Sequence, residues 1–134
     1  MYKIIRDVFS SPNRGVANLC QLSIIKVLEY LNINKKIIKS SELEYDRSLP
    51  AAERLMDICN TFGSSEYLNS IGGKALYSKE YFYNSGFSLK FVRMENISYN
   101  QGGNEFVPNL SIIDVLMWCS KKQVRELLEA YTFE

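Results

Sequence analysis

The chain has 134 residues, of which 46% are hydrophobic and 23% charged, and its sixteen basic and fifteen acidic residues give a net charge of +1. This composition is that of an ordinary globular protein and excludes a disordered one, so residues 1–134 are expected to form a single domain around one core. The charge balance gives no overall field for a polyanion or a membrane surface, and nucleic acid is not an expected partner.

Cysteine usage and the length of the apolar runs indicate a cytoplasmic protein. The cysteines Cys20, Cys59 and Cys119 each lie in an apolar helical context without C-x-x-C spacing, and the chain contains no histidine. Buried thiols of a reducing compartment fit this pattern better than a disulfide or a metal site. The apolar runs are far shorter than the ~20 residues of a membrane span, and the N-terminus lacks a signal peptide's apolar stretch.

The first half of the chain predicts two helices and a strand. Apolar residues recur at spacings of three and four from Val16 to Leu31, which predicts a largely buried helix. Lys36–Lys39 is typical of a short strand. Pro50 can occupy the first turn of a second helix, whose apolar side runs from Ala52 to Phe62, and Gly63 is its expected left-handed cap.

The third quarter of the chain predicts a strand, a turn, a helix and another strand. Glu66–Asn69 is a second strand candidate, and Ser70–Lys74 follows it as a glycine-rich turn. Ser78 can cap a short helix that ends near Asn84. The alternation of Phe87–Val92 predicts a third strand.

Two capping boxes follow the loop of residues 96–109. They are Ser111-x-x-Asp114 and Ser120-x-x-Gln123, and each predicts the start of a helix. The apolar face expected of the second helix consists of Val124, Leu127, Leu128 and Tyr131.

Three short strands separated by helices predict an α/β fold. The expected architecture is a small, mostly parallel sheet of about three strands flanked by helices, because sequential parallel strands need crossovers of about this length. An antiparallel α+β arrangement is the alternative, since the strands are short and charged enough to be sheet edges.

The turn after the second predicted strand is a candidate anion site. Backbone N–H groups at Gly72 and Gly73, with the Lys74 ammonium nearby, can cradle a phosphate or a carboxylate. The segment is not the phosphate loop G-x-x-x-x-G-K-[ST], because the first glycine is missing and Ala75 follows the lysine. A tight turn that uses glycine for positive φ, with a solvated lysine, is an equally good interpretation.

Polar residues follow both of the first two predicted strands. Ser40 and Ser41 come after Lys36–Lys39, and Asn69 and Ser70 end the next strand. A parallel sheet would place both pairs along one edge, where hydroxyls and an amide can orient a sugar or a carboxylate. Taken singly, each is more often a loop or cap residue.

No catalytic residue, cofactor or metal ligand can be identified from the residues alone. Without histidine, a Ser-His or Cys-His mechanism is excluded, and any general base would be a carboxylate, a lysine or a tyrosine. The charged pairs Asp46 with Arg47 and Arg54 with Asp57 are interpreted as solvated pairs.

Several segments resemble, in order and spacing, the C-terminal part of the WbqC-like family. The likeness extends over about residues 16–120, and its segments are Lys36–Leu43, Arg54–Cys59, Tyr67–Tyr77, Phe87–Phe91 and Phe106–Leu116.

The resemblance implies a role in bacterial surface-polysaccharide (O-antigen) biosynthesis, as a transferase-like component of sugar modification. Full-length members begin with a segment of the form H-x-P-x-Y-L-P-W-x-G-Y-F, which has no counterpart here. The chain is therefore expected to be a fragment, a degenerate member or one half of a complex. The positions that match family motifs are Ser40, Ser41, Gly72, Gly73, Lys74, Tyr77, Pro108, Asn109, Ser111 and Asp114.

Two hypotheses of function follow. In the first, the protein binds an anionic or sugar-nucleotide ligand with Ser40, Ser41, Asn69, Ser70, Gly72, Gly73, Lys74 and Tyr77. In the second, it is a non-catalytic binding or assembly module. The aromatic cluster from Tyr77 to Phe87 and the apolar residues Tyr2, Ile5, Val8 and Phe9 exceed what a three-stranded core needs. They predict a homodimer, or a separate partner that supplies the N-terminal half.

Overall fold

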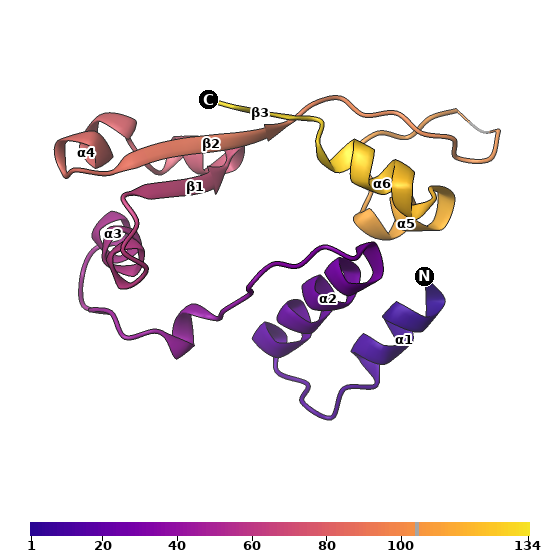
Figure 1. Cartoon of the computed structure of the whole chain (residues 1–134), viewed down its shortest axis with the longest axis horizontal. Coiled ribbons are helices and arrows are strands. Elements are labelled where there is room, and N and C mark those ends of the chain that lie inside the picture. Colours follow the sequence, from indigo (N-terminus) through magenta and orange to yellow (C-terminus); the bar gives the residue numbers. More distant parts are fainter. Residues whose placement is uncertain (104) are drawn as a thin grey trace. The chain divides into compact units, whose positions relative to one another are not determined.

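The structure is a computed structural model that describes residues 1–103 and 105–134. Within these residues it contains six α-helices, two 3₁₀-helices and three β-strands (Figure 1). The helices are α1 (Tyr2–Phe9), α2 (Val16–Leu31), α3 (Ala51–Thr61), α4 (Lys79–Asn84), α5 (Ile112–Trp118) and α6 (Lys121–Leu128). The strands are β1 (Glu66–Ser70), β2 (Ser88–Met94) and β3 (Tyr131–Phe133), and the 3₁₀-helices are η1 (Ser40–Glu42) and η2 (Ile71–Ala75).

The chain divides into two compact units, each built from two segments. The helical unit consists of Met1–Lys39 and Asn96–Ala130, and the sheet unit consists of Ser40–Glu95 and Tyr131–Glu134. The chain therefore passes between the units three times. The organisation of residues 1–134 as one domain stays a prediction.

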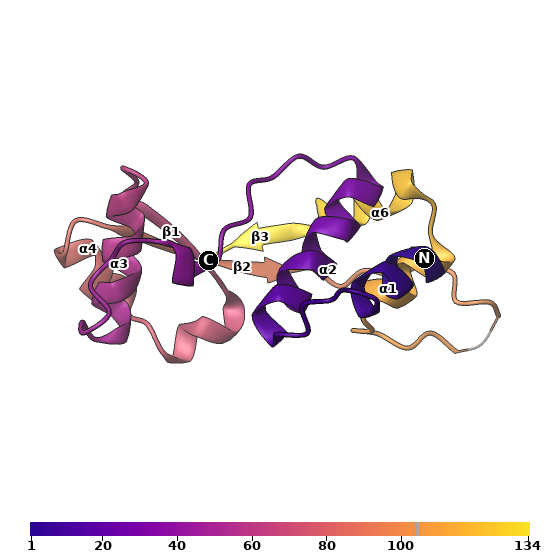
Figure 2. The same cartoon turned by 90° about the horizontal axis from the view of Figure 1, so that it is seen from below.

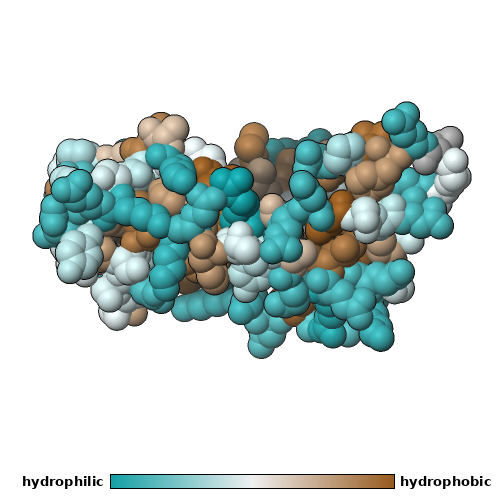
Figure 3. Space-filling model, turned by 90° about the horizontal axis from the view of Figure 1, so that it is seen from above, coloured by the Kyte–Doolittle hydropathy of each residue, from teal (hydrophilic) through white to brown (hydrophobic). Residues whose placement is uncertain are grey.

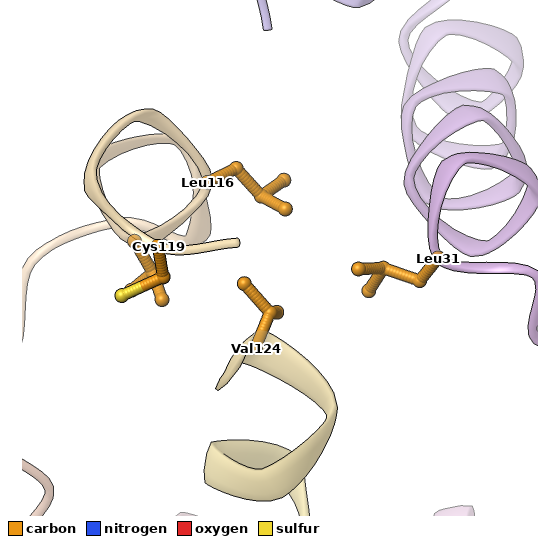
Figure 4. Close-up of a cluster of buried hydrophobic side chains, with 5 residues drawn as sticks. Leu31, Leu116, Cys119 and Val124 are labelled. Atoms are coloured by element: carbon orange, nitrogen blue, oxygen red, sulfur yellow. The ribbon is translucent and has the colours of Figure 1, made fainter. Parts of the chain in front are cut away.

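The helical unit is built around a small apolar core where α2, α5 and α6 meet. Leu31 of α2, Leu116 of α5 and Val124 of α6 point toward one another in Figure 4, and Cys119 follows directly after α5. Leu31 and Val124 are almost completely removed from solvent. Burial of this apolar surface is the main favourable contribution that holds the three helices together.

The starts of α5 and α6 are capped by serine, as the sequence predicts. The Ser120 hydroxyl accepts the Gln123 N–H, and the Gln123 side-chain oxygen accepts the Ser120 N–H at 2.9 Å, which completes a capping box. The Ser111 hydroxyl accepts the Ile113 N–H at 3.2 Å. The predicted capping box Ser111-x-x-Asp114 was wrong, because the Asp114 carboxylate accepts the Tyr99 hydroxyl at 2.6 Å instead of the Ser111 N–H.

The sheet unit contains a three-stranded mixed sheet in the order β1-β2-β3. β1 pairs with β2 in parallel, and β3 pairs with β2 antiparallel, as the opposite strand directions in Figure 2 show. Helices α3 and α4 cover one face, where Met56 and Phe82 pack on Leu89 and Phe91. The predicted α/β fold with a small sheet of about three strands is confirmed, with β1, α4 and β2 as its βαβ unit.

One strand assigned from the sequence was wrong, and one strand of the structure was missed. Lys36–Lys39 is not a strand, because two apolar residues between lysines offer no face to bury, and the Ile37 carbonyl accepts a side-chain hydrogen bond from Gln21 instead. The third strand is Tyr131–Phe133, whereas Tyr131 was expected on the helix that now ends at Leu128.

Cap and thiol assignments were mostly confirmed. Gly63 has φ +62° after the C-cap of α3, as expected, whereas Pro50 is the N-cap of that helix and lies just outside its first turn. Cys59 and Cys119 are buried free thiols whose pKa burial raises. Cys20 is also free, but it is exposed, so the expectation that all three thiols are buried was wrong for this residue.

Candidate functional site

One face of the sheet unit is apolar at the start of the strands and polar at their ends. Tyr67 lies beside Leu89 and Asn69 beside Phe91 in the parallel register, and alternation places all four side chains on the face that α3 and α4 cover. The Phe91 backbone exchanges both hydrogen bonds with Glu134, at 2.8 and 2.9 Å. Asn69, Phe91 and Glu134 therefore form one row across the sheet.

Two cations meet the carboxylate at the end of this row. Lys74 Nζ lies 2.6 Å from Glu134 Oε2, and Arg93 Nε lies 2.5 Å from Glu134 Oε1. Arg93 is two residues beyond Phe91, so it shares the same face of β2. The hydrogen bonds from Lys74 and then from Arg93 lower the pKa of Glu134, whose carboxylate is the anionic partner of both. We call Lys74, Arg93 and Glu134 the charged cluster.

Gly73 brings Lys74 to this place. Gly73 is buried, and a Cβ on it would lie 2.4 Å from Asn69 Nδ2, so a side chain at this position would displace Asn69. Neither Gly72 nor Gly73 has a positive φ, so a left-handed backbone does not explain either glycine. At position 73 a glycine is needed because the Asn69 side chain lies too close for a Cβ. The turn predicted from the sequence is the 3₁₀-helix η2, and it starts at the end of β1.

The predicted polar rim is only partly assembled. Asn69 belongs to the row that ends at Glu134, but Ser70 alternates to the opposite face. Ser40 and Ser41 do not follow a strand, because residues 36–39 form none, and they belong to the 3₁₀-helix η1 instead. The Ser41 carbonyl accepts a hydrogen bond from Arg47 at 3.1 Å. The binding roles of these four residues stay predictions.

Tyr77 belongs to the edge of the apolar core of the sheet unit. Its ring meets Phe82 edge-on, with ring centres 6.2 Å apart, while Tyr67 stacks on Phe82 at 5.9 Å. Burial raises the pKa of the Tyr67 hydroxyl. Phe82 is completely buried, so this part of the aromatic cluster serves packing, whereas Tyr81 and Tyr83 remain exposed.

The other charged pairs from the sequence hold loops together. The Asp46 carboxylate accepts both the N–H and the hydroxyl of Ser48, which lowers its pKa, and the Asp57 carboxylate accepts the Asp46 N–H at 2.8 Å. Within residues 1–103 and 105–134, no group of three or more acidic or cysteine side chains is arranged to hold a metal ion.

A separate cavity of about 480 Å³ lies in the helical unit between α1, α2 and the start of α5. Its lining is almost entirely apolar and includes Ile5, Val8 and Leu19. Its lining residues carry no charged side chain, and their only hydroxyl groups are those of Ser23 and Ser111, so it offers few groups that would orient a polar substrate.

Sequence reasoning missed Arg93 and Glu134. Lys74 and Glu134 are 60 positions apart, and Glu134 joins the row only because β3 pairs with β2. A motif search cannot find such a cluster, since the antiparallel return of a three-residue strand brings its members together.

None of the described helices has the length and apolar character needed to cross a membrane.

Comparison with known proteins identifies the family. No curated protein and no solved structure matches the chain. The model of the WbqC-like protein family matches residues 1–126, which includes α1 as well as the segments that carry the resemblance. The chain therefore belongs to the WbqC-like protein family.

Proposed function

We propose that this protein acts in bacterial surface-polysaccharide biosynthesis, where it binds an anionic sugar derivative such as a nucleotide sugar at the end of β1. The observation that carries the proposal is the charged cluster, in which two cations already stabilise a negative group at the end of the row that starts with Asn69. Membership of the WbqC-like family supports the pathway.

The position of the cluster suits a ligand. In α/β proteins, ligands bind beyond the carboxyl ends of parallel strands, and Lys74 follows directly after that end of β1. Ammonium and guanidinium groups form short, charge-assisted hydrogen bonds with phosphate oxygens, while an amide such as that of Asn69 can bind a sugar hydroxyl. Ser40, Ser41, Ser70, Gly72, Gly73 and Tyr77 complete the proposed ligand-binding set.

The residues present supply binding and electrostatic orientation rather than proton transfer near neutral pH. The chain contains no histidine, and the hydrogen bonds from Lys74 and Arg93 lower the pKa of Glu134, which makes the carboxylate of the charged cluster a weak base near neutral pH. We therefore propose that the protein holds the sugar donor or acceptor as a component of a transferase, and that a partner supplies groups for transfer.

A non-catalytic assembly module is the second candidate. It is favoured by the apolar side chains exposed on the sheet face opposite the charged cluster, which include Leu68, Met94 and Phe133. Such a surface is typical of a protein interface.

Thermal shift with UDP-glucose separates the two candidates. The chain offers a matched pair of variants, because Lys74 and Lys90 each form a 2.6 Å ion pair with a glutamate, but Lys74 lies in η2 and Lys90 in β2. We expect UDP-glucose to stabilise the wild type and Lys90→Ala, by about 2.7 kcal/mol at 100 times Kd, but not Lys74→Ala.

The same experiment can reject the proposal. If UDP-glucose and a panel of other nucleotide sugars leave the wild type unstabilised, or stabilise Lys74→Ala equally, the assembly module is the better description.

A further inference from the structure

We infer that Glu134 is a built-in competitor of the ligand: its carboxylate occupies the position that a phosphate group takes between Lys74 and Arg93. This inference rests on the proposed function and deepens it, because it names the anionic group that is recognised and a residue that limits its affinity.

The geometry of the cluster resembles that of a bound anion. Each Glu134 oxygen has its own cation, with Lys74 at Oε2 and Arg93 at Oε1. The other lysine–glutamate pair of the sheet, Lys90 with Glu66, joins one cation to one oxygen. Two cations that approach two oxygens of one group can equally approach two oxygens of a phosphate.

The Glu134 carboxylate is weakly held and can be exchanged. The side chains of Lys74 and Arg93 are 58% and 54% exposed, and that of Glu134 is 29% exposed, so water reaches the two cations and screens both ion pairs. The backbone of Glu134 stays hydrogen-bonded to Phe91 whichever way its side chain points. Its carboxylate can therefore leave the cations without unpairing the sheet.

The charge of the cluster selects the ligand class. Lys74 and Arg93 carry two positive charges, and Glu134 neutralises one of them. A phosphate or pyrophosphate group carries more negative charge than a carboxylate and can engage both cations at once. The cluster thus favours phosphorylated ligands over carboxylates of the same size.

Isothermal titration calorimetry with inorganic pyrophosphate, a ligand without a sugar, tests the inference directly. Glu134→Gln retains the side-chain length and the backbone pairing but removes the charge, so we expect it to bind pyrophosphate about fivefold more tightly than the wild type at low salt. The gain should disappear when Lys74→Ala or Arg93→Ala is added. Glu66→Gln, the matched control, should bind as the wild type does.

The outcomes are distinguishable from those of the proposed function. If Glu134→Gln binds pyrophosphate no more tightly than the wild type, or keeps its gain without Lys74, the inference is wrong. Should nucleotide sugars still bind through Lys74 in that case, the proposed function stands alone. Tighter pyrophosphate binding by Glu134→Gln, with no nucleotide sugar bound by any variant, would support the inference and reject the proposed function.

Discussion

At the scale of single residues, two adjacent glycines show how one position can be constrained twice. Gly102 and Gly103 have φ of +80° and +87°, a conformation that side chains disfavour. A Cβ on Gly102 would lie 2.4 Å from ring carbon Cη2 of Trp118, whereas a Cβ on Gly103 would meet nothing within 4 Å. Gly102 is therefore required by both the backbone and the tryptophan.

The two glycines predict different costs of substitution. Gly103→Ala should lower the free energy of unfolding by about 1 kcal/mol through its positive φ alone. Gly102→Ala should cost about 1–3 kcal/mol more, because the Trp118 ring must move. Urea denaturation measures both, and adding Trp118→Leu should remove most of the difference. Equal costs for the two alanine variants would show that Trp118 does not hold the loop.

At the scale of elements, the helix caps predict stability changes without a change in binding. Ser111→Ala and Ser120→Ala should each lower the free energy of unfolding by about 1 kcal/mol, because each removes a hydroxyl that accepts a first-turn N–H. Both serines belong to the helical unit, whereas the charged cluster belongs to the sheet unit. Pyrophosphate titration of the folded variants should therefore give the wild-type affinity.

A different result for Ser111 would change its assignment. If Ser111→Ala loses ligand binding while urea denaturation shows unchanged stability, this serine is a ligand contact and not a cap.

The elements that the sequence predicts well are those with local signals. Apolar spacing and caps located α2, α3, α4, α5 and α6, because these patterns act within a few residues. β3 was missed because a three-residue strand carries too little periodicity, and its existence depends on pairing with β2. The strand predicted at Lys36–Lys39 was wrong for a related reason: the segment has a strand-like pattern, but no neighbouring strand pairs with it.

The candidate site was half predictable for the same reason. Lys74 and Asn69 stand out because a glycine-rich turn follows a strand, and both signals lie within a few residues. Arg93 and Glu134 carry no local signal, since only the register of β2 with β3 places them beside Lys74.

At the scale of the whole molecule, exposed apolar surface is the most prominent feature. Apolar side chains lie among the hydrophilic ones on the face drawn in Figure 3. In the helical unit, Tyr2 and Phe9 of α1 are exposed while Val8 is buried. In the sheet unit, one face is covered by α3 and α4, and the other exposes Leu68, Val92, Met94, Tyr131 and Phe133 wholly or in part.

The exposed apolar surface supports the prediction that the protein forms a homodimer or binds a partner. We expect light scattering at micromolar concentration to give about twice the chain mass of 15.5 kDa. Met94→Lys should shift the protein toward monomer, because it places a charge on the open sheet face. Val16→Ser, which alters an exposed apolar residue of the helical unit, is the matched control. A monomer that persists at all concentrations would contradict self-association.

The late return of β3 also orders the folding of the protein. β3 pairs with β2 across roughly forty intervening residues, and contacts of such sequence separation form slowly. While the polypeptide is being synthesised, β1, α4 and β2 can assemble first, but β2 then exposes an unpaired edge until residues 131–133 emerge. The edge of β2 is thus open to pairing with other chains during this interval, and β3 then replaces it with an edge strand of only three residues.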